Sequence, residues 1–580
     1  MGKFLLGLIT GAILIVVLGA IVFFAIASLK SKPATVADGS TLVLRLSGEV
    51  PEKPPVDFPF PIPMIQDKAP LTVEGIWSLL HRAAADSRIK ALVLEPEGVS
   101  LGWAKMQEIH SDIEQFRKSG KPVYAYLKSP GTREYYLATA ASRIYMEPVD
   151  TLGLKGLGLE LMYFKNTLDK LGVQVDVEHA GKYKDFGDMF TKTSMSPETK
   201  EVMNSVIDDI YGDLVNTIAA GRGKDAATIR AIIDDGPFLS TQARDKGLVD
   251  SLRFEDEMFG ELKTALKQKE LKKLSAHDFA GVPDSSVTSQ DRIAFVVGEG
   301  TITRGSEDSD GDNGLEAEQF DKILSKVQND SAIKAVIVRI DSPGGEVTAS
   351  DEMWRAMNEL RKKKPVVISM SDAAASGGYY MAMSGDTIIA YPGTETGSIG
   401  VVFGKPNLHG LYDKVGVTKD QISRGRFALI DSDYQSLNDA GRTKLREGID
   451  ADYKDFVAKV ADARRKKPEE IEPIAQGRVW MGDQAKANGL VDELGGLDRA
   501  VQLARERAKI PTSSKVNIVL YPGKRSLFDV LFKSSTDSEA DALMSRAGLE
   551  PLKAAWHDDR LRVWMKGGML RMMPFAIEFH

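Results

Sequence analysis

The chain contains no cysteine among its 580 residues, and this absence removes several kinds of chemistry. Disulfide bonds, a catalytic thiolate and zinc sites with cysteine ligands are excluded. Histidine is scarce, with seven residues, and no HExxH zinc motif is present. No Gly-Lys pair is followed by Ser or Thr, so the sequence has no P-loop for a nucleotide. We therefore expect neither a metal nor another cofactor.

The chain has no overall excess of positive charge, and one long segment has no charged residue. The formal net charge is -7, so no excess of positive charge indicates a nucleic-acid partner. Residues 4–29 (FLLGLITGAILIVVLGAIVFFAIASL) carry no charge at all and are long enough to cross a bilayer as a helix. The apolar core of a cleaved signal peptide is shorter, about 7–15 residues. We therefore predict one uncleaved transmembrane helix, within residues 1–35.

An internal repeat organises most of the remaining chain. Residues 86–94 (DSRIKALVL) recur 244 residues later as residues 330–338 (DSAIKAVIV). Each copy alternates amphipathic helical patterns with buried apolar strands, which is typical of an α/β unit with mostly parallel strands. The sequence therefore predicts an N-terminal unit at 36–275, a C-terminal unit at 276–510 and an extension at 511–580.

Three segments lie outside the pattern that the two copies of the repeat share. In the extension, residues 515–520 are predicted to add a strand. The Met-rich apolar residues 564–575 fit core packing, a subunit contact or a membrane surface. The acidic run at 307–313 is spaced somewhat like a calcium loop, but it lacks the glycine and the final glutamate of that loop. We therefore interpret it as a solvated loop.

A serine lies where a strand is predicted to meet a helix. Residues 371–380 (SDAAASGGYY) follow the apolar run at 365–370, and the tyrosines open a helical pattern. A helix N-terminus supplies free N–H groups and a positive dipole end, which suit an oxyanion. Ser376 could also be a simple helix cap. The choice between nucleophile and cap depends on the rest of the chain.

The two copies of the repeat differ at this serine. Where the second copy has Ser376-Gly377-Gly378, the first copy has Thr132-Arg133-Glu134. The second copy also has a Ser-Pro-Gly-Gly segment that ends at Gly345, and Ser398 lies where the first copy has Leu154. A purely structural role would not concentrate serines and glycine pairs in one copy. This asymmetry favours a nucleophile at Ser376.

A serine nucleophile needs a base, and the sequence offers two kinds. None of the histidines lies in a motif that belongs beside Ser376, although tertiary proximity leaves a histidine triad open. The alternative is a lysine kept neutral by burial. In residues 180–186 (AGKYKDF), Tyr183 and Phe186 flank Lys184 and could shield it from water. The corresponding part of the second copy has no lysine.

These features together resemble signal peptide peptidase A in its long, two-unit form, also called protease IV. The resemblance rests on the hydrophobic anchor, the tandem units and the motifs DSPGG, ASGGYY, TGSIG and GKYK. It implies tandem ClpP/crotonase-like units and a serine protease that uses a Ser/Lys dyad. The Tyr-Lys pair of the family selects Lys184 rather than Lys182. The residues implied are Ser376 as nucleophile, Lys184 as general base, Ser398 as the residue orienting the amine, and Gly377 with Gly344 or Gly345 as oxyanion donors.

The same resemblance implies a substrate and a place in the cell. The substrate class would be remnant signal peptides, which are hydrophobic and remain in the membrane after secretory cleavage. The protein would be a homotetramer anchored in the bacterial inner membrane by a single span, with its catalytic part on the periplasmic side. Two other functions compete with this one: a crotonase-like acyl-CoA enzyme, and a non-catalytic membrane scaffold.

Overall fold

The computed structural model describes most of the two predicted units and little of the termini. The described residues are 35–54, 70–283, 291–305, 314–511, 514–523 and 568–573. The predicted anchor at 4–29 and the acidic run at 307–313 lie outside these ranges. Within the ranges, none of the helices combines the length and the apolar character that a membrane span requires.

The first unit is built on a parallel sheet with the strand order β8-β4-β3-β2-β1-β9. Leu42, Leu44 and Leu46 lie on one face of a strand of this sheet, and each is at most 3% exposed. The strands are β1 (Ser40–Gly48), β2 (Ile89–Val99), β3 (Val123–Leu127), β4 (Arg143–Met146), β8 (Ser251–Leu252) and β9 (Lys272–Ser275). A separate pair consists of β5 (Thr151–Leu152) and β7 (Phe238–Leu239).

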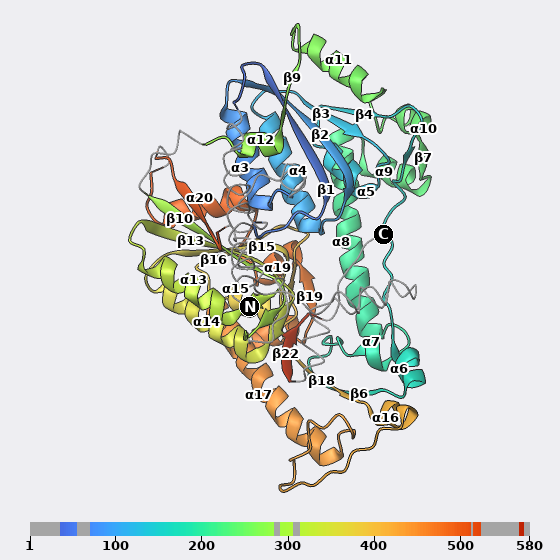
Figure 1. Cartoon of the computed structure of the whole chain (residues 1–580), viewed down its shortest axis with the longest axis vertical. Coiled ribbons are helices and arrows are strands. Elements are labelled where there is room, and N and C mark those ends of the chain that lie inside the picture. The colour runs from blue at the N-terminus through green and yellow to red at the C-terminus, as the bar shows by residue number, and fades with distance from the viewer. Residues whose placement is uncertain are drawn as a thin grey trace, which may run out of the picture.

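Helices alternate with these strands, and their apolar faces form a core with the sheet. The long helix α8 continues past the first unit, where Gln484 of the second unit donates a hydrogen bond to Ser205 over 3.2 Å (Figure 1). The helices are α3 (Val73–Ala85), α4 (Trp103–Arg117), α5 (Thr132–Ala138), α6 (Lys165–Leu171), α7 (Asp188–Thr191), α8 (Pro197–Arg222), α9 (Ala226–Asp234), α10 (Ser240–Asp245), α11 (Glu255–Ala265) and α12 (Ala276–Ala280).

The second unit repeats this architecture around its own sheet. The central strand order is β19-β17-β15-β13-β10-β21, with β16 and β20 attached beside β15. The predicted strand of the extension is present as β21, which is parallel to β10. The strands are β10 (Arg292–Glu299), β13 (Ile333–Ser342), β15 (Val366–Ala375), β16 (Thr387–Ala390), β17 (Glu395–Gly397), β19 (Val479–Met481), β20 (Glu493–Leu494) and β21 (Asn517–Tyr521).

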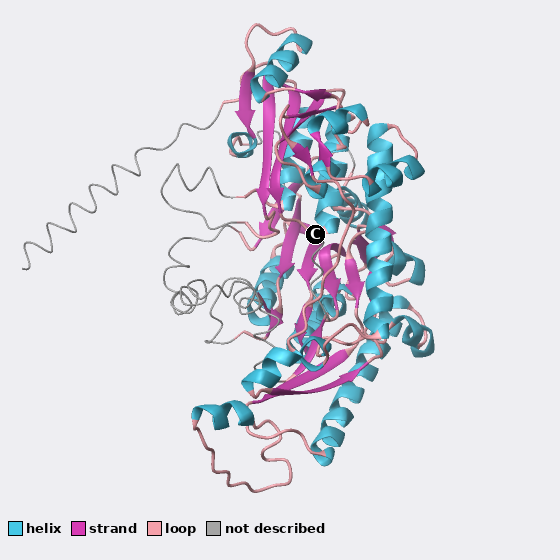
Figure 2. Cartoon of the chain, turned by 90° about the vertical axis from the view of Figure 1, so that its right-hand side faces the viewer, coloured by secondary structure: helices cyan, strands magenta, loops and turns pink. Residues whose placement is uncertain are grey.

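The helices of the second unit follow the predicted repeat closely. Helices α13 and α14 begin 244 residues after α3 and α4 and have the same lengths, 13 and 15 residues. Figure 2 shows that the strands of the two units succeed one another along the long axis of the molecule. The helices are α13 (Ala317–Asn329), α14 (Val347–Arg361), α15 (Gly377–Ala382), α16 (His409–Val415), α17 (Asp439–Arg464), α18 (Pro468–Ile471), the 3-10 helix η1 (Glu472–Ile474), α19 (Gly482–Asn488) and α20 (Leu497–Arg507).

A third sheet draws its strands from both units and from the end of the chain. Its order is β12-β11-β14-β22-β18-β6, in which β6 belongs to the first unit and the rest to the second unit or the extension. The antiparallel ladder between β6 and β18 extends from the pair Ala180–Val401 to the pair Gln174–Asn407. Its strands are β6 (Gln174–Ala180), β11 (Ile302–Thr303), β12 (Leu315–Glu316), β14 (Gly344–Glu346), β18 (Val401–Asn407) and β22 (Met569–Met572).

A buried ion-pair network fixes the two units to each other. Arg339 on β13 is fully buried and lies 2.8 Å from Glu52 and 2.6 Å from Glu108, both of the first unit. Its guanidinium also donates to the hydroxyls of Ser369 and Ser371 over 3.0 and 3.1 Å. Buried charges of this kind are stable only when they are paired and hydrogen-bonded. Arg339 of the second unit and the two glutamates of the first unit therefore need each other.

Candidate active site

Ser376 lies at the junction of β15 and α15, as the sequence predicted. The strand continues to Ala375 and the helix begins at Gly377, earlier than the tyrosines indicated, because glycine fits where space is short. A Cβ on Gly378 would lie 2.6 Å from the main-chain oxygen of Ser342. Ser376 itself has φ 55° and ψ -110°, a conformation that costs a non-glycine residue about 1–3 kcal/mol. Such strain is typical of a residue held in place for function.

Lys184 reaches the second unit through the shared sheet. Its strand β6 ends at Ala180, and Gly181 (φ +111°) turns the chain so closely against Gln476 that a Cβ would lie 2.6 Å from that residue's carbonyl carbon. The N–H of Tyr183 then donates to the oxygen of Gln476 over 2.7 Å. The backbone directly before Lys184 is therefore held by the second unit.

The Lys184 amine makes three contacts, all with serine oxygens. Nζ lies 2.8 Å from Oγ of Ser376, 2.9 Å from the main-chain oxygen of Ser398 and 2.9 Å from Oγ of Ser398. A neutral amine has two N–H donors and one lone pair. It can donate to both oxygens of Ser398 and accept a hydrogen bond from the Ser376 hydroxyl. The three predicted residues Lys184, Ser376 and Ser398 therefore lie together.

Burial controls the charge of this amine. Lys184 is fully buried, and none of the ion pairs found in the described ranges involves it. Burial lowers the pKa of Lys184 well below its ordinary value of 10.5. The carboxylate of Asp185 acts in the opposite direction, and the positive charge of Arg571 lowers the pKa further. The geometry thus supplies an amine that can accept a proton next to a hydroxyl that can donate one.

Ser398 is held in a strained conformation of its own, with φ 49°. Its N–H donates to the main-chain oxygen of Arg478 over 2.7 Å, which fixes the residue after β17. Gly477 lies behind the lysine, where a Cβ would approach Cβ of Lys184 to 2.7 Å. These close contacts orient the amine and leave it little room to move.

The glycines predicted as oxyanion donors surround Ser376. The N–H of Gly377 opens helix α15, directly after the serine. The N–H of Gly344 already donates to Oγ of Ser342 over 3.2 Å, while Gly344 adopts φ +101°. Gly344 therefore already has a partner for its N–H, and Gly345, the next residue of β14, remains a candidate for the second donor.

The corresponding position in the first unit is used for structure. The Glu134 carboxylate accepts the N–H of Val99 over 2.7 Å and that of Gly131 over 2.9 Å. The Arg133 guanidinium donates to the main-chain oxygen of Leu101 over 3.1 Å. These charged side chains occupy the place of the glycine pair, so this copy presents no comparable opening for a carbonyl oxygen.

Four histidines in the described part of the chain have their contacts elsewhere. His81 is paired with Asp498 at 2.8 Å, and His110 lies 3.0 Å from the hydroxyl of Thr139. His179 contacts the main chain of Gly181, while His409 stacks on a tyrosine. Together with the position of Lys184, these contacts favour the lysine over the histidine triad as the base.

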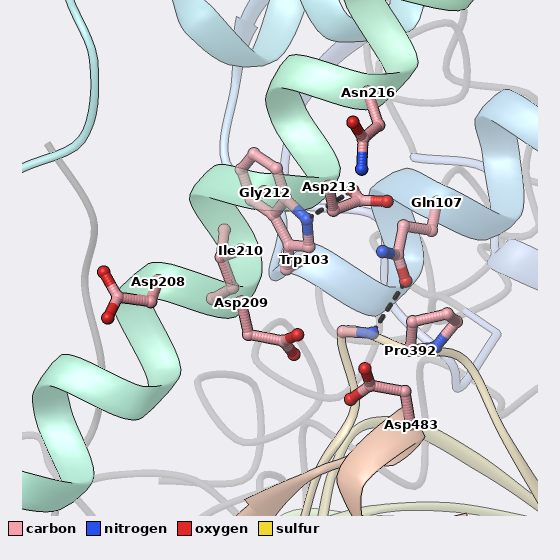
Figure 3. A pocket seen from close by; sticks show the side chains of 11 residues that line it. Trp103, Gln107, Asp208, Asp209, Ile210, Gly212, Asp213, Asn216, Pro392 and Asp483 are labelled. Atoms are coloured by element: carbon pink, nitrogen blue, oxygen red, sulfur yellow. Dashed lines mark hydrogen bonds between the residues drawn. The ribbon is translucent and has the colours of Figure 1, made fainter. Parts of the chain in front are cut away.

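Two cavities of the described structure lie away from Ser376, between the units. One, of about 270 Å³, is lined by Trp103, Gln107 and several aspartates of α8 (Figure 3). The other, of about 540 Å³, lies beside Arg133 and Asp372. No group of three or more potential metal ligands occurs in the described ranges. Neither cavity is lined by Lys184, Ser376 or Ser398.

Sequence reasoning missed one component of this site, the strand β22. It comes from the Met-rich segment near the C-terminus, for which core packing was one of the interpretations. Leu570 and Met572 do pack against Phe186 and Phe190, close to Lys184 in the sequence. Its pairing with β14 had no signal in the sequence, because the segment has no counterpart in the first copy of the repeat.

The chain is similar to known proteins over most of its length. The sequence matches Peptidase family S49 at residues 115–269 and 358–511, and Clp protease at 309–396. Serine protease SPPA, chloroplastic, of Arabidopsis thaliana is 34% identical over 506 residues, which cover 86% of this chain and 73% of that protein. Protease 4 of Salmonella typhi is 32% identical over 484 residues, covering 80% and 76%. Protease 4 of Haemophilus influenzae is 31% identical over 451 residues, covering 74% and 71%.

Proposed function

The chain belongs to peptidase family S49 and is a two-unit serine protease of the signal peptide peptidase A type, and from this we infer that Ser376 is its nucleophile and Lys184 its general base. The observation that carries the inference is the buried amine of Lys184, 2.8 Å from Oγ of Ser376. Ser398 acts as a positioning residue, because it engages the amine through two oxygens.

The reaction begins with proton transfer from Ser376 to Lys184. The Oγ atom attacks the peptide carbonyl carbon, and the N–H groups of Gly377 and Gly345 receive the developing oxyanion. The Lys184 ammonium then protonates the leaving amine as the C–N bond breaks, which leaves an ester on Ser376. A water molecule loses a proton to Lys184 and attacks the ester, and the released serine recovers its proton from the lysine.

A covalent label tests the assignment of the nucleophile. The full-length protein is treated with a sulfonyl fluoride, and the modified residue is identified by peptide mass spectrometry. We expect one adduct, on Ser376, and strongly reduced labelling of the Lys184→Met variant, because the hydroxyl is activated by the amine. Ser384→Ala serves as the matched control and keeps the label. An adduct at a different serine, with Ser376 unmodified, would refute the proposal.

The pH dependence of kcat/KM provides a second test, since only neutral Lys184 accepts a proton. Activity is expected to rise with pH and to level off below 10.5, because the pKa of Lys184 is lowered by burial. The Asp185 carboxylate raises the pKa of Lys184, so Asp185→Asn is expected to shift the rising limb to lower pH. The pKa of Asp185 itself is raised to about 6, chiefly by burial, so the shift is measured above that pH. A profile that is flat, or that falls with pH, contradicts a lysine base.

The substrate and the cellular location extend the proposal beyond the site. We propose that the protein degrades remnant signal peptides as a homotetramer, anchored by residues 4–29 in the bacterial inner membrane with its active site on the periplasmic side. The uncharged length of residues 4–29 supports the anchor. The family membership and the name of one relative, a putative signal peptide peptidase SppA of Enterococcus faecium that is 32% identical over 194 residues, support the substrate class.

A further inference from the structure

A strand from the far end of the chain lies against the glycines next to Ser376. Strand β22 is antiparallel to both of its neighbours, β14 and β18. It sets Arg571 opposite Gly345 on one side and Leu570 opposite Val402 on the other. Proteins that bind extended peptides often do so by strand addition, with main-chain hydrogen bonds for affinity and pockets for side chains. We infer that β22 occupies the place of a substrate peptide.

The register of β22 identifies which residue faces the nucleophile. The main-chain oxygen of Arg571 lies so close to the active-site glycines that a Cβ on Gly344 would approach it to 2.0 Å, and one on Gly377 to 3.1 Å. Two residues after Arg571, the N–H of Met573 donates to the main-chain oxygen of Pro343 over 2.7 Å. Gly345 is paired with Arg571 in the sheet, so its N–H and that of Gly377 are the groups that we propose for the oxyanion. Arg571 thus stands for the residue whose carbonyl is attacked, and the residue after it stands for the leaving side.

The side chain of Arg571 enters a defined pocket, which we call the Arg571 pocket. Its guanidinium carbon lies 3.7 Å from the ring centre of Tyr380 and 5.2 Å from that of Phe456. One Nη atom lies 3.8 Å from the Asp455 carboxylate, and the other donates to the main-chain oxygen of Val347 over 3.5 Å. Arg571 is only 1% exposed. Aromatic faces and a carboxylate are the surroundings that favour a cation.

The charges around the pocket are unbalanced without a cation from the peptide. Asp351 and Asp455 share the ammonium of Lys459, which lies 2.6 and 3.0 Å from them. A third carboxylate, Asp452, has one buried oxygen without a hydrogen-bond partner. Three carboxylates therefore face one lysine of the second unit, and the second cation is supplied by Arg571. A basic side chain at this place therefore reduces the excess of negative charge, so that three carboxylates face two cations.

In the first unit, the place that corresponds to the Arg571 pocket is filled by a side chain of that unit, Trp103. Helix α4 begins with Trp103, and its counterpart α14 begins with the smaller Val347. The indole N–H of Trp103 donates to Asp213 over 2.9 Å (Figure 3). The ring of Trp103 lies 5.3 Å from that of Tyr136. These partners precede the aspartate and the tyrosine of the Arg571 pocket by 242 and 244 residues. Valine in the second unit leaves open the space that tryptophan fills in the first.

We propose that the Arg571 pocket is a specificity pocket for an arginine or lysine side chain of the substrate, at the residue whose carbonyl Ser376 attacks. The inference rests on the proposed function and adds a substrate class to it: extended peptides cut on the carboxyl side of a basic residue. The serine ester then forms on that residue, and the amine of the next residue leaves with the proton held by Lys184. The apolar neighbours Leu570 and Met572 indicate that hydrophobic residues fit on either side.

A pair of quenched fluorescent peptides tests the specificity. One contains the sequence of residues 568–573, GMLRMM, and the other has leucine in place of the arginine. With the full-length protein we expect kcat/KM for the arginine peptide to be about tenfold higher or more, with cleavage between Arg and Met shown by mass spectrometry. Equal rates, or faster cleavage of the leucine peptide, overturn the specificity proposal alone. Failure to cleave either peptide, together with no label on Ser376, overturns the proposed function when it persists in a variant whose residues 568–573 are replaced by glycine and serine, because β22 then no longer occupies the substrate's place.

Two variants assign the preference to the pocket. The double variant Asp452→Asn with Asp455→Asn is expected to bring the ratio of the two kcat/KM values close to one, because the attraction for a cation is removed. Asp209→Asn changes an equally acidic site between the units and is expected to leave the ratio at its parental value. A ratio that survives the double variant shows that the carboxylates do not select the substrate. Labelling of Ser376 in all three proteins confirms that each is folded.

Discussion

Replacing Lys184 by methionine is expected to lower kcat/KM for peptide hydrolysis by about 10²–10⁴-fold, the usual contribution of a positioned general base. Methionine has nearly the same length and suits a buried site, but it cannot accept a proton. The hydroxyl of Ser376 would keep its position on the strained turn and lose the group that activates it. The measurement is the steady-state rate on a quenched peptide at several pH values.

The matched control for this variant is Lys182→Met. Lys182 is two residues away, is exposed and contacts the ring of Tyr183, so the change makes the same replacement of lysine by methionine outside the site. Its kcat/KM is expected to remain within about twofold of the parent. The double variant with Ser376→Ala should lose no more activity than either single change, because the two residues act as a unit. Additive losses would show that the lysine acts elsewhere.

The same substitution has a signature in stability. Since the pKa of Lys184 is lowered in the folded protein, the unfolded chain binds one more proton at pH values between that lowered pKa and 10.5. The free energy of unfolding of the parent should therefore rise with pH across this window. Lys184→Met removes the rise, whereas Lys182→Met retains it. Urea denaturation at a series of pH values measures the slope.

Arg339→Met is expected to destabilise the protein by about 3–5 kcal/mol, the cost of leaving buried carboxylates without their cation. Glu52 and Glu108 both pair with this guanidinium, and none of the three side chains is more than 1% exposed. Both carboxylates come from the first unit, so the loss should also weaken the contact between the units. Chemical denaturation followed by fluorescence gives the change in the free energy of unfolding.

An exposed ion pair provides the comparison. Arg499 lies 2.7 Å from Glu493, and the two side chains are 30% and 38% exposed. Solvent screens such pairs, so Arg499→Met is expected to cost no more than about 1 kcal/mol. Equal costs at the two sites would mean that the Arg339 network is not dehydrated. A triple variant with Glu52→Gln and Glu108→Gln should recover part of the loss, because no unpaired charge then remains.

Much of this fold follows from the repeat in the sequence. The shared spacing of 244 residues predicted two α/β units, and α13 and α14 begin where α3 and α4 indicated. The position of Ser376 followed from local rules, because an apolar strand, a glycine pair and a helical pattern succeed one another there. The difference between the two copies then predicted which of them has the open site, because Arg133 and Glu134 fill the corresponding place in the first copy.

Other features depend on contacts between distant residues, which periodicity does not encode. Residues 174–180 pair with residues 401–407 because of how the two units dock, and this docking is what brings Lys184 to the serine. Arg339 has the apolar neighbours of an ordinary central strand, so its two carboxylate partners could not be predicted from the sequence. The pairing of Arg571 with Gly345 likewise joins residues from segments that share no pattern.

The ladder between β6 and β18 has a kinetic consequence. It joins the strand that leads to the amine and the strand that follows Ser398 within one polypeptide. The two reactive groups therefore meet at a fixed effective concentration, which dilution of the protein does not lower. If either group came from a neighbouring molecule, every dissociation of the assembly would switch the chemistry off. Because the two units are fused in one chain, folding alone brings the amine to the hydroxyl, and no association between molecules is needed.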